Sequence, residues 1–168
     1  MPGASQAFQH CRILAARTVT IHTATVVWTL SGDFKRRTYS RAHVWTFDGG
    51  AVVAASSSPH NVPLPYSNAA GVDPEEGLLA ATSSCHMLWF LDFAVRAGFT
   101  VERYEDRAEG VIGRDDRGLM AFTAVTLNSQ ITFTGEGPDM AGLAALHAAA
   151  HKECFVGNSL RCEVVVAG

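Results

Sequence analysis

The feature that most constrains the fold of this chain is segment 73–98, whose apolar residues leave hardly any polar face. It opens with Asp73-Pro74-Glu75-Glu76, which supplies an N-cap, a proline at the first helical position and the glutamate of a capping box. The apolar positions are Leu78, Leu79, Ala80, Ala81, Met87, Leu88, Trp89, Phe90, Leu91, Phe93, Ala94 and Val95. A helix of this kind is buried on nearly all sides, so we expect it at the centre of the fold, ending near Gly98.

Alternating apolar and polar residues predict strands before and after this helix. We expect strands over 17–30, 38–47, 51–57, 101–114, 118–133 and 161–167, and a second helix from about Pro138 to Glu153. The Asp48-Gly49-Gly50 turn should join two of the strands as a hairpin. Segment 58–72 contains Pro59, Pro63 and Pro65 without periodicity, and it predicts a loop long enough to be functional or to cross to a partner subunit. This order of strands and helices predicts one α+β domain over residues 1–168.

Composition excludes several classes of protein. The 168 residues are 48% hydrophobic and 17% charged, with a net charge of −3, which indicates a globular domain with an ample core. The cluster Lys35-Arg36-Arg37 is too short for a nucleic-acid site. His10 and Arg12 stand where a signal peptide needs an apolar run, and Asp92 breaks the longest apolar stretch, so we expect a cytoplasmic protein that does not enter a membrane.

Cysteines are the candidate reactive groups. In the cytosol, four cysteines are expected to be thiols, metal ligands or catalytic groups rather than a disulfide framework. Cys85 and Cys154 each lie in a long apolar segment, whereas Cys11 and Cys162 have no partner motif and are interpreted as structural. A buried cysteine is inert unless its surroundings lower its pKa or offer a second sulfur.

The order β-β-β-α-β-β-α-β and the motifs DPEEGLLAATSSCHML and HAAAHKECFVGNSL resemble the osmotically inducible protein C and organic hydroperoxide resistance (OsmC/Ohr) family. The resemblance covers most of the chain. It implies antiparallel sheets wrapped around two central helices in an intertwined homodimer. It also implies a peroxidase without a cofactor or metal, which reduces organic hydroperoxides at a dithiol and regains electrons from a thiol donor, such as a dihydrolipoyl group.

The resemblance assigns the dithiol to Cys85 and Cys154, and it extends to Arg41 in YSRAHVWTFDGG and to Glu75. Cys85 would be the peroxidatic thiolate and Cys154 the resolving thiol. Arg41 would supply a permanent positive charge, and Glu75 would accept a hydrogen bond from it. Ten residues of continuous helix separate Glu75 from Cys85 by about 15 Å. Glu75 is therefore expected to serve Cys85 of the partner subunit, unless the helix is interrupted.

Each assignment has a simpler alternative. Cys85 could fill space in the core, Glu75 could complement the helix dipole, and Arg41 could be a solvated strand residue. Arg17, Arg36 and Arg37 are substitutes for its role. His86 follows Cys85 by one residue and so points about 100° away on a helix, which makes it a poor base for that sulfur.

Two other functions stay open at this stage. His151 and Cys154, with Cys85 and His86, could form a Cys/His metal site, although zinc knuckles are absent from the sequence. An apolar cavity around Trp89, Phe90 and Phe155 could instead hold a ligand without catalysis. If the chain is a peroxidase, an apolar lining favours bulky alkyl hydroperoxides over hydrogen peroxide. Phe155 stands where one branch of the OsmC/Ohr family has proline, which leaves the substrate undefined.

Overall fold

The computed structural model describes residues 19–167 and confirms the α+β class. The strands before the first long helix are β1 (Ala24–Trp28), β2 (Gly32–Asp33), β3 (Thr38–Tyr39), β4 (His43–Phe47) and β5 (Val52–Ala55). The later elements are α1 (Pro74–Arg96), β6 (Thr100–Asp106), β7 (Glu109–Arg114), β8 (Met120–Thr134), α2 (Met140–Glu153), α3 (Phe155–Ser159) and β9 (Glu163–Ala167).

Helix α1 begins as the sequence predicts. The Asp73 side chain accepts a hydrogen bond from the Glu76 backbone at 2.8 Å, and the Glu76 carboxylate accepts one from the Asp73 backbone at 3.0 Å. The helix is continuous to Arg96, and Gly98 follows with φ of +86°, a conformation that glycine adopts without steric cost. The predicted bounds of this helix are therefore confirmed.

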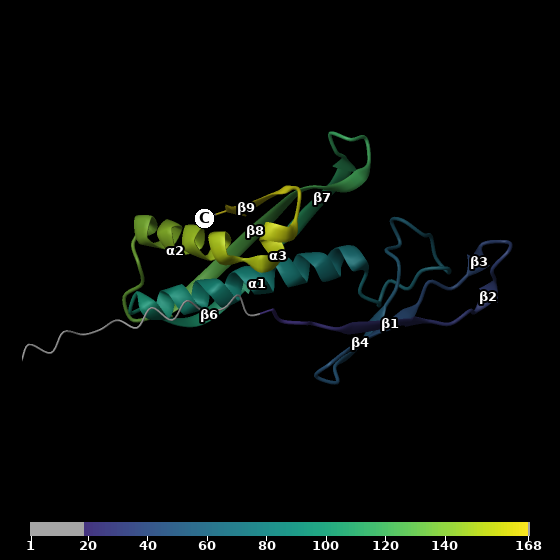
Figure 1. Ribbon diagram of the computed structural model, residues 1–168, viewed down its shortest axis with the longest axis horizontal. Coiled ribbons are helices and arrows are strands. Elements are labelled where there is room, and N and C mark those ends of the chain that lie inside the picture. The colour runs from purple at the N-terminus through teal and green to yellow at the C-terminus, as the bar shows by residue number, and fades with distance from the viewer. Residues whose placement is uncertain (1–18, 168) are drawn as a thin grey trace, which may run out of the picture.

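The predicted burial of α1 on nearly all sides is wrong within one chain. Its buried residues are Thr82, His86, Phe90 and Ala94, one face of the helix, whereas Leu88 is 63% exposed and Val95 71% exposed. The reason is that α2 and the sheet pack on that one face (Figure 1), while the opposite face, with Leu88 and Val95, stays exposed.

The C-terminal half of the chain forms the core. Strands β6 and β7 pair antiparallel with successive halves of β8, and β9 pairs with β8 in parallel. The parallel pair departs from the expected antiparallel sheets because α2 and α3 carry the chain from the end of β8 back toward its beginning, so β9 runs in the same direction as β8. Phe90 and Ala94 of α1 pack against Leu146 and Ala150 of α2, so the core lies between the two long helices and β6–β8.

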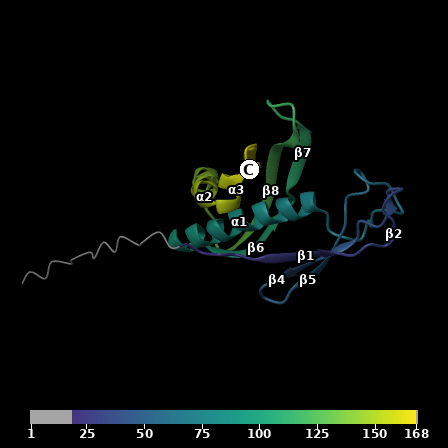
Figure 2. The same cartoon turned by 45° about the vertical axis from the view of Figure 1, so that its right-hand side comes forward.

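The N-terminal strands form a separate sheet of order β1-β4-β5, with β2 and β3 as a small hairpin beside it. Figures 1 and 2 show this sheet extending past the N-terminal end of α1, away from α2. It is joined to the start of α1 by a bridge between Ala55 and Val72 and by Trp45 against Gly77. All five residues of β1 are exposed, so this sheet lacks a hydrophobic cover in the described part of its own chain.

Strand bounds differ from the expectations in three places. The strand predicted over 101–114 is two strands, β6 and β7, because each pairs with a different part of β8. The strand predicted over 17–30 is ordered as β1 only from Ala24 to Trp28, and residues 17–18, Arg17 included, lie outside the described part of the chain, as does Cys11. The strand predicted over 38–47 is divided into β3 and β4 at Ser40-Arg41-Ala42. The hairpin at Asp48-Gly49-Gly50 and the loop over 58–72 are confirmed.

Within residues 19–167, α1 is the one helix long and apolar enough to cross a membrane by length and composition. In this structure it packs against α2, α3 and β6. Its last turns also carry Asp92 and Arg96, which form an ion pair at 2.7 Å. These contacts fit a core helix of a folded domain.

Candidate active site

Cys85 and Cys154 come together between α1 and the junction of α2 with α3. Cys85 is half-buried in the middle of α1, and Cys154 is 2% exposed at the C-cap of α2. The Cys154 thiol lies 3.9 Å from the Thr82 carbonyl oxygen, one turn before Cys85, and its sulfur accepts a hydrogen bond from the Gly157 N–H at 3.3 Å. Neither cysteine forms a disulfide in this structure.

The environment of Cys154 disfavours its thiolate. Burial raises the pKa of Cys154 to about 11, and the neighbouring Cys85 adds to the rise, whereas the Gly157 N–H opposes it. Burial acts in this direction because an apolar medium penalises the charged form of a thiol. Cys154 is therefore suited to react as a protonated thiol after another group has been activated.

A buried histidine pair connects α1 and α2, next to Cys85 in the sequence of α1. His86 Nε2 and His147 Nδ1 are 3.0 Å apart, and their rings are nearly parallel at 11°. Burial is the main cause that lowers the pKa of His86 to about 4, and it also lowers the pKa of His147. His86 thus faces α2 as a neutral core residue, in agreement with the expectation that it is a poor base for Cys85.

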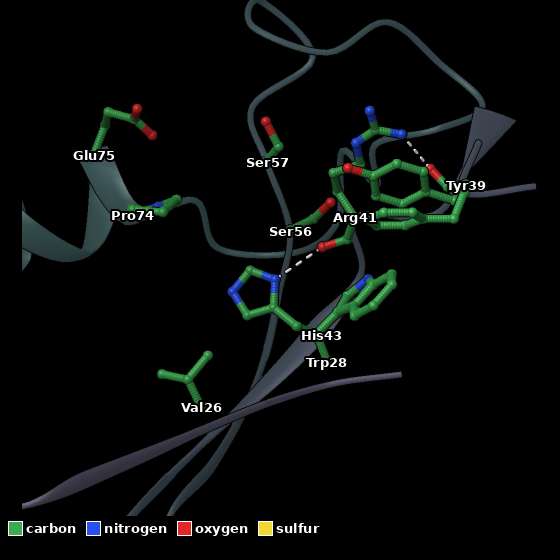
Figure 3. Close-up of a pocket in the computed structure, with 10 residues that line it drawn as sticks. Val26, Trp28, Tyr39, Arg41, His43, Ser56, Ser57, Pro74 and Glu75 are labelled. Atoms are coloured by element: carbon green, nitrogen blue, oxygen red, sulfur yellow. Dashed lines mark hydrogen bonds between the residues drawn. The ribbon is translucent and has the colours of Figure 1, made fainter. Parts of the chain in front are cut away.

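Arg41 and Glu75 line a different place, a cavity of about 400 Å³ at the N-terminal end of α1. Its wall includes an aromatic group, Trp28, Phe34 and Tyr39, in which the Phe34 and Tyr39 rings stack at 4.8 Å. The remaining lining residues are Val26, His43, Ser56, Ser57 and Pro74 (Figure 3). The cavity is therefore largely apolar, with a few polar groups.

The Arg41 guanidinium is held by its own chain. It donates hydrogen bonds to the carbonyl oxygens of Arg37 and Tyr39, and it lies 3.7 Å above the centre of the Tyr39 ring. Figure 3 shows it on the opposite side of the cavity from the Glu75 carboxylate. The expected Arg41–Glu75 hydrogen bond is thus not formed in this structure. Of Arg36, Arg37 and Arg41, the last is the one that lines the cavity.

Glu75 is incompletely paired. Its Oε1 accepts a hydrogen bond from Asn61 Nδ2 at 3.2 Å, whereas its Oε2 is buried and has no hydrogen-bond partner among the described residues. A buried carboxylate oxygen without a partner is costly. The cavity therefore has an acceptor ready for a donor that the described part of this chain does not supply.

His43 has a defined orientation. Its Nδ1 lies 2.8 Å from the carbonyl oxygen of Arg41, and because a carbonyl can only accept, Nδ1 must carry the hydrogen. The other ring nitrogen, Nε2, faces the open space between Val26 and Pro74 (Figure 3). This residue is not among the sequence candidates, although its position two residues after Arg41 is a usable signal, because such residues share a face of an extended chain.

The predicted site residues therefore form two separate halves. Cys85 and Cys154 make one, and neither cysteine lines the cavity that contains Arg41 and Glu75. Because α1 is continuous from Pro74, Glu75 and Cys85 stand about 15 Å apart along the helix. The alternative of an interrupted helix is excluded.

The open alternatives can be compared with the same geometry. His86 pairs with His147, and among residues 19–167 there is no group of three or more His, Cys, Asp or Glu side chains placed to hold a metal ion. Phe90 is fully buried in the core, whereas Phe155 is 68% exposed. Trp89 packs edge-on against Phe155 at 5.6 Å. Phe90 and Phe155 therefore lie in different environments, one in the core and the other at the surface.

Comparison with known proteins places these features in context. The family described as OsmC-like protein matches residues 67–167. A solved OsmC-like protein of unknown function from Vibrio cholerae is 45% identical, with a TM-score of 0.86 over 89% of this chain and 99% of its own.

Two more distant structures share the fold. An organic hydroperoxide resistance protein from Elizabethkingia anophelis is 19% identical, with a TM-score of 0.64 over 90% of this chain and 95% of its own. An organic hydroperoxide resistance protein from Legionella pneumophila is 18% identical, with a TM-score of 0.62 over 89% and 96%. No curated protein matches the sequence.

Proposed function

Because the chain belongs to the OsmC-like family, we propose that it is a thiol peroxidase that reduces organic hydroperoxides with Cys85 and Cys154. The observation that carries the proposal is the meeting of these thiols from α1 and from the end of α2, with Cys154 Sγ 3.9 Å from the carbonyl of Thr82, one turn before Cys85. The names of the solved relatives from Elizabethkingia anophelis and Legionella pneumophila support the same reaction.

The proposed reaction uses the two cysteines in sequence. The Cys85 thiolate attacks the outer oxygen of ROOH, the O–O bond breaks, and the products are the Cys85 sulfenic acid and an alcohol after protonation of RO⁻. The Cys154 thiol then condenses with the sulfenic acid to form a disulfide and water. A dithiol reductant, such as a dihydrolipoyl group, returns two electrons and restores both thiols.

The complete site forms in a homodimer. The Arg41 cavity has an unpaired Glu75 oxygen and no cysteine among its lining residues, and Glu75 stands about 15 Å from the Cys85 of its own chain. The exposed apolar residues of β1 and of α1, among them Val26, Leu88 and Val95, need a cover of the size that a second copy provides. In this arrangement Arg41 and Glu75 of one subunit activate Cys85 of the partner subunit.

The lining of the cavity favours a bulky substrate. Trp28, Phe34 and Tyr39 offer aromatic contact to an alkyl or aryl group, which hydrogen peroxide cannot use. We therefore propose that the protein prefers cumene hydroperoxide or a lipid hydroperoxide to hydrogen peroxide.

Thiol counting tests this function. Reduced protein is treated with one equivalent of cumene hydroperoxide, and intact mass and peptide mapping follow the thiols. We expect two thiols to be lost as a Cys85–Cys154 disulfide in the wild type. Cys154→Ser should instead accumulate a sulfenic acid on Cys85, while Cys162→Ser, the matched control, should behave as the wild type does.

Two results would contradict these proposals. Unchanged thiols after the hydroperoxide would refute the peroxidase proposal. Faster oxidation by hydrogen peroxide than by cumene hydroperoxide would refute the substrate preference alone.

A further inference from the structure

The proposed reaction contains one step, the protonation of the leaving alkoxide, to which no group has yet been assigned. When the thiolate takes the outer oxygen of ROOH, the other oxygen departs as an alkoxide, which is a strong base and must gain a proton. An arginine stabilises the developing charge but does not give up its proton, because a guanidinium stays protonated in proteins. The proton must therefore come from another group near the O–O bond or from water.

His43 is placed for that step. We propose that His43 is a catalytic residue that passes the proton of the Cys85 thiol to the departing alkoxide. The inference rests on the proposed function, since it requires Cys85 of the partner subunit to reach the cavity that His43 lines.

The hydrogen bond of His43 defines which of its ring nitrogens carries the hydrogen. Because Nδ1 donates to the carbonyl of Arg41 at 2.8 Å, the neutral ring presents a bare Nε2, which can accept a proton. The same contact fixes the ring orientation, as a carbonyl behind a catalytic or metal-binding imidazole commonly does. Nε2 faces the cavity rather than a partner in the described part of the protein (Figure 3).

Several polar side chains surround the same cavity. Arg41, Glu75, Ser56 and Ser57 line it together with His43. Of these side chains, an imidazole is the one that both gains and loses a proton readily near neutral pH. Arg41 and Glu75 are the charged groups that face it, from the segment before β4 and from the start of α1.

One proton moves from the Cys85 thiol to the alkoxide through His43. The thiol of Cys85 transfers its proton to Nε2, which leaves a thiolate and an imidazolium. The thiolate forms the S–O bond, the O–O bond breaks, and the imidazolium gives the proton to RO⁻. The net reaction converts Cys–SH and ROOH into Cys–SOH and ROH, and His43 returns to its neutral state.

The leaving group provides a sharp test. An alkyl hydroperoxide releases an alkoxide and needs the proton, whereas a peroxycarboxylic acid releases a carboxylate and does not. The rate constants for oxidation of the reduced wild type by cumene hydroperoxide and by peracetic acid are measured in single turnovers, by quenching with an alkylating agent and reading the mass.

The informative variant is His43→Asn. Its side-chain amide can still donate to the Arg41 carbonyl from the position of Nδ1, but it has no basic nitrogen at the position of Nε2. We expect the rate with cumene hydroperoxide to fall on the order of 100-fold. The rate with peracetic acid should fall much less, because it is affected only through thiolate formation. The ratio of the two rates should therefore change by about tenfold or more.

The matched control is His60→Asn, an exposed histidine in the loop after β5, which should keep both rates. A folded His43→Asn protein with an unchanged ratio, whether both rates are retained or both fall equally, would overturn the assignment of His43. Circular dichroism checks folding, and His43→Gln replaces His43→Asn in the same comparison if the latter does not fold. Failure of the wild type to react with either oxidant would instead overturn the proposed function itself.

Discussion

At the scale of single residues, the two cysteines differ in environment, and their reactivity should differ accordingly. Cys154 is 2% exposed and burial raises its pKa to about 11, whereas Cys85 is half-buried. We expect iodoacetamide at pH 8 to alkylate Cys154 of the reduced, native protein on the order of 100-fold more slowly than Cys85, because few Cys154 thiolates exist at that pH. Peptide mapping by mass spectrometry at timed intervals measures both rates.

Unfolded protein is the control for this prediction. In 6 M guanidinium chloride both thiols are solvated, so the two rates should converge to within about threefold. Equal rates in the native protein would contradict the described burial of Cys154.

The pairing of these residues can be inferred from sequence only in part. Motifs identify Cys85 and Cys154, but their proximity depends on the packing of α2 on α1, which no local pattern encodes. For His43 the sequence offers only its position two residues after Arg41, because the orientation of the ring depends on one contact with the Arg41 carbonyl. The lack of a hydrogen-bond partner for Glu75 Oε2 among the described residues likewise depends on the folded cavity, and the residues next to Glu75 in the sequence do not predict it.

At the scale of elements, the His86–His147 pair joins α1 to α2 and should make their packing depend on pH. The pKa of His86 is lowered to about 4 in the folded chain, against about 6.5 for an unfolded histidine. Above pH 6.5 both states are neutral and the full stability is present. As pH falls from 6.5 toward 4, the unfolded chain binds a proton that the folded chain does not, so stability is lost.

The expected loss is about 3 kcal/mol from His86 across that interval, with His147 acting in the same direction. Urea denaturation at pH 7.5, 6, 5 and 4.5, at one protein concentration, measures it. His86→Asn removes the titrating ring and should flatten the dependence on pH, although it also lowers stability at pH 7.5. The same slope in the variant and the wild type would assign the acid sensitivity to other groups. Two such groups are His151, whose charge acts on His86, and Asp106, whose charge acts on His147.

The capping box at the N-terminus of α1 should contribute measurably to stability. Asp73→Ala removes the acceptor for the Glu76 N–H and breaks the capping box. We expect a loss of about 1 kcal/mol in the free energy of unfolding. Asp48→Ala, an exposed residue of the β4–β5 turn, is the control and should change stability by less than about 0.5 kcal/mol. Equal losses in the two variants, again from urea denaturation, would show that the capping box contributes nothing specific.

Elements are more predictable than contacts for a physical reason. The start of α1 is encoded locally by Asp73, Pro74 and Glu76, and the hairpin at Gly50 by a turn that requires positive φ. The short α3 has no such signal because only five residues form it, capped by the Cys154 sulfur. The break between β6 and β7 is hidden because both pair along the single long β8, so their combined pattern is that of one strand.

At the scale of the whole molecule, the proposed dimer would explain both the separation of the site into two halves and the exposure of the apolar faces. A helix that the sequence predicts to be buried on nearly all sides is covered on one face here, and Leu88 and Val95 remain exposed. The N-terminal sheet extends past α1 with β1 uncovered (Figure 2). In the proposed dimer, the N-terminal sheet of one subunit packs against the exposed face of α1 in the partner subunit, so each surface covers the other.

A complementation experiment tests this arrangement directly. Cys85→Ser lacks the reactive sulfur, and Arg41→Ala lacks the guanidinium, so each variant alone should be nearly inactive with cumene hydroperoxide. In a mixed dimer, the intact Cys85 of the Arg41→Ala chain meets the intact Arg41 of the other chain. Random assortment after joint refolding makes half of the molecules mixed, each with one of two sites restored, so about a quarter of wild-type activity should return.

Two controls accompany the complementation experiment. Light scattering of the wild type should give twice the chain mass of 17.9 kDa, and refolding each variant alone should restore nothing. If Arg41 served the Cys85 of its own chain, the mixture would contain no chain with both residues and would stay inactive. Recovery of activity therefore requires a site shared between subunits, and its absence in a confirmed mixed dimer would refute the shared site while leaving the thiol chemistry of Cys85 and Cys154 to be judged by thiol counting alone.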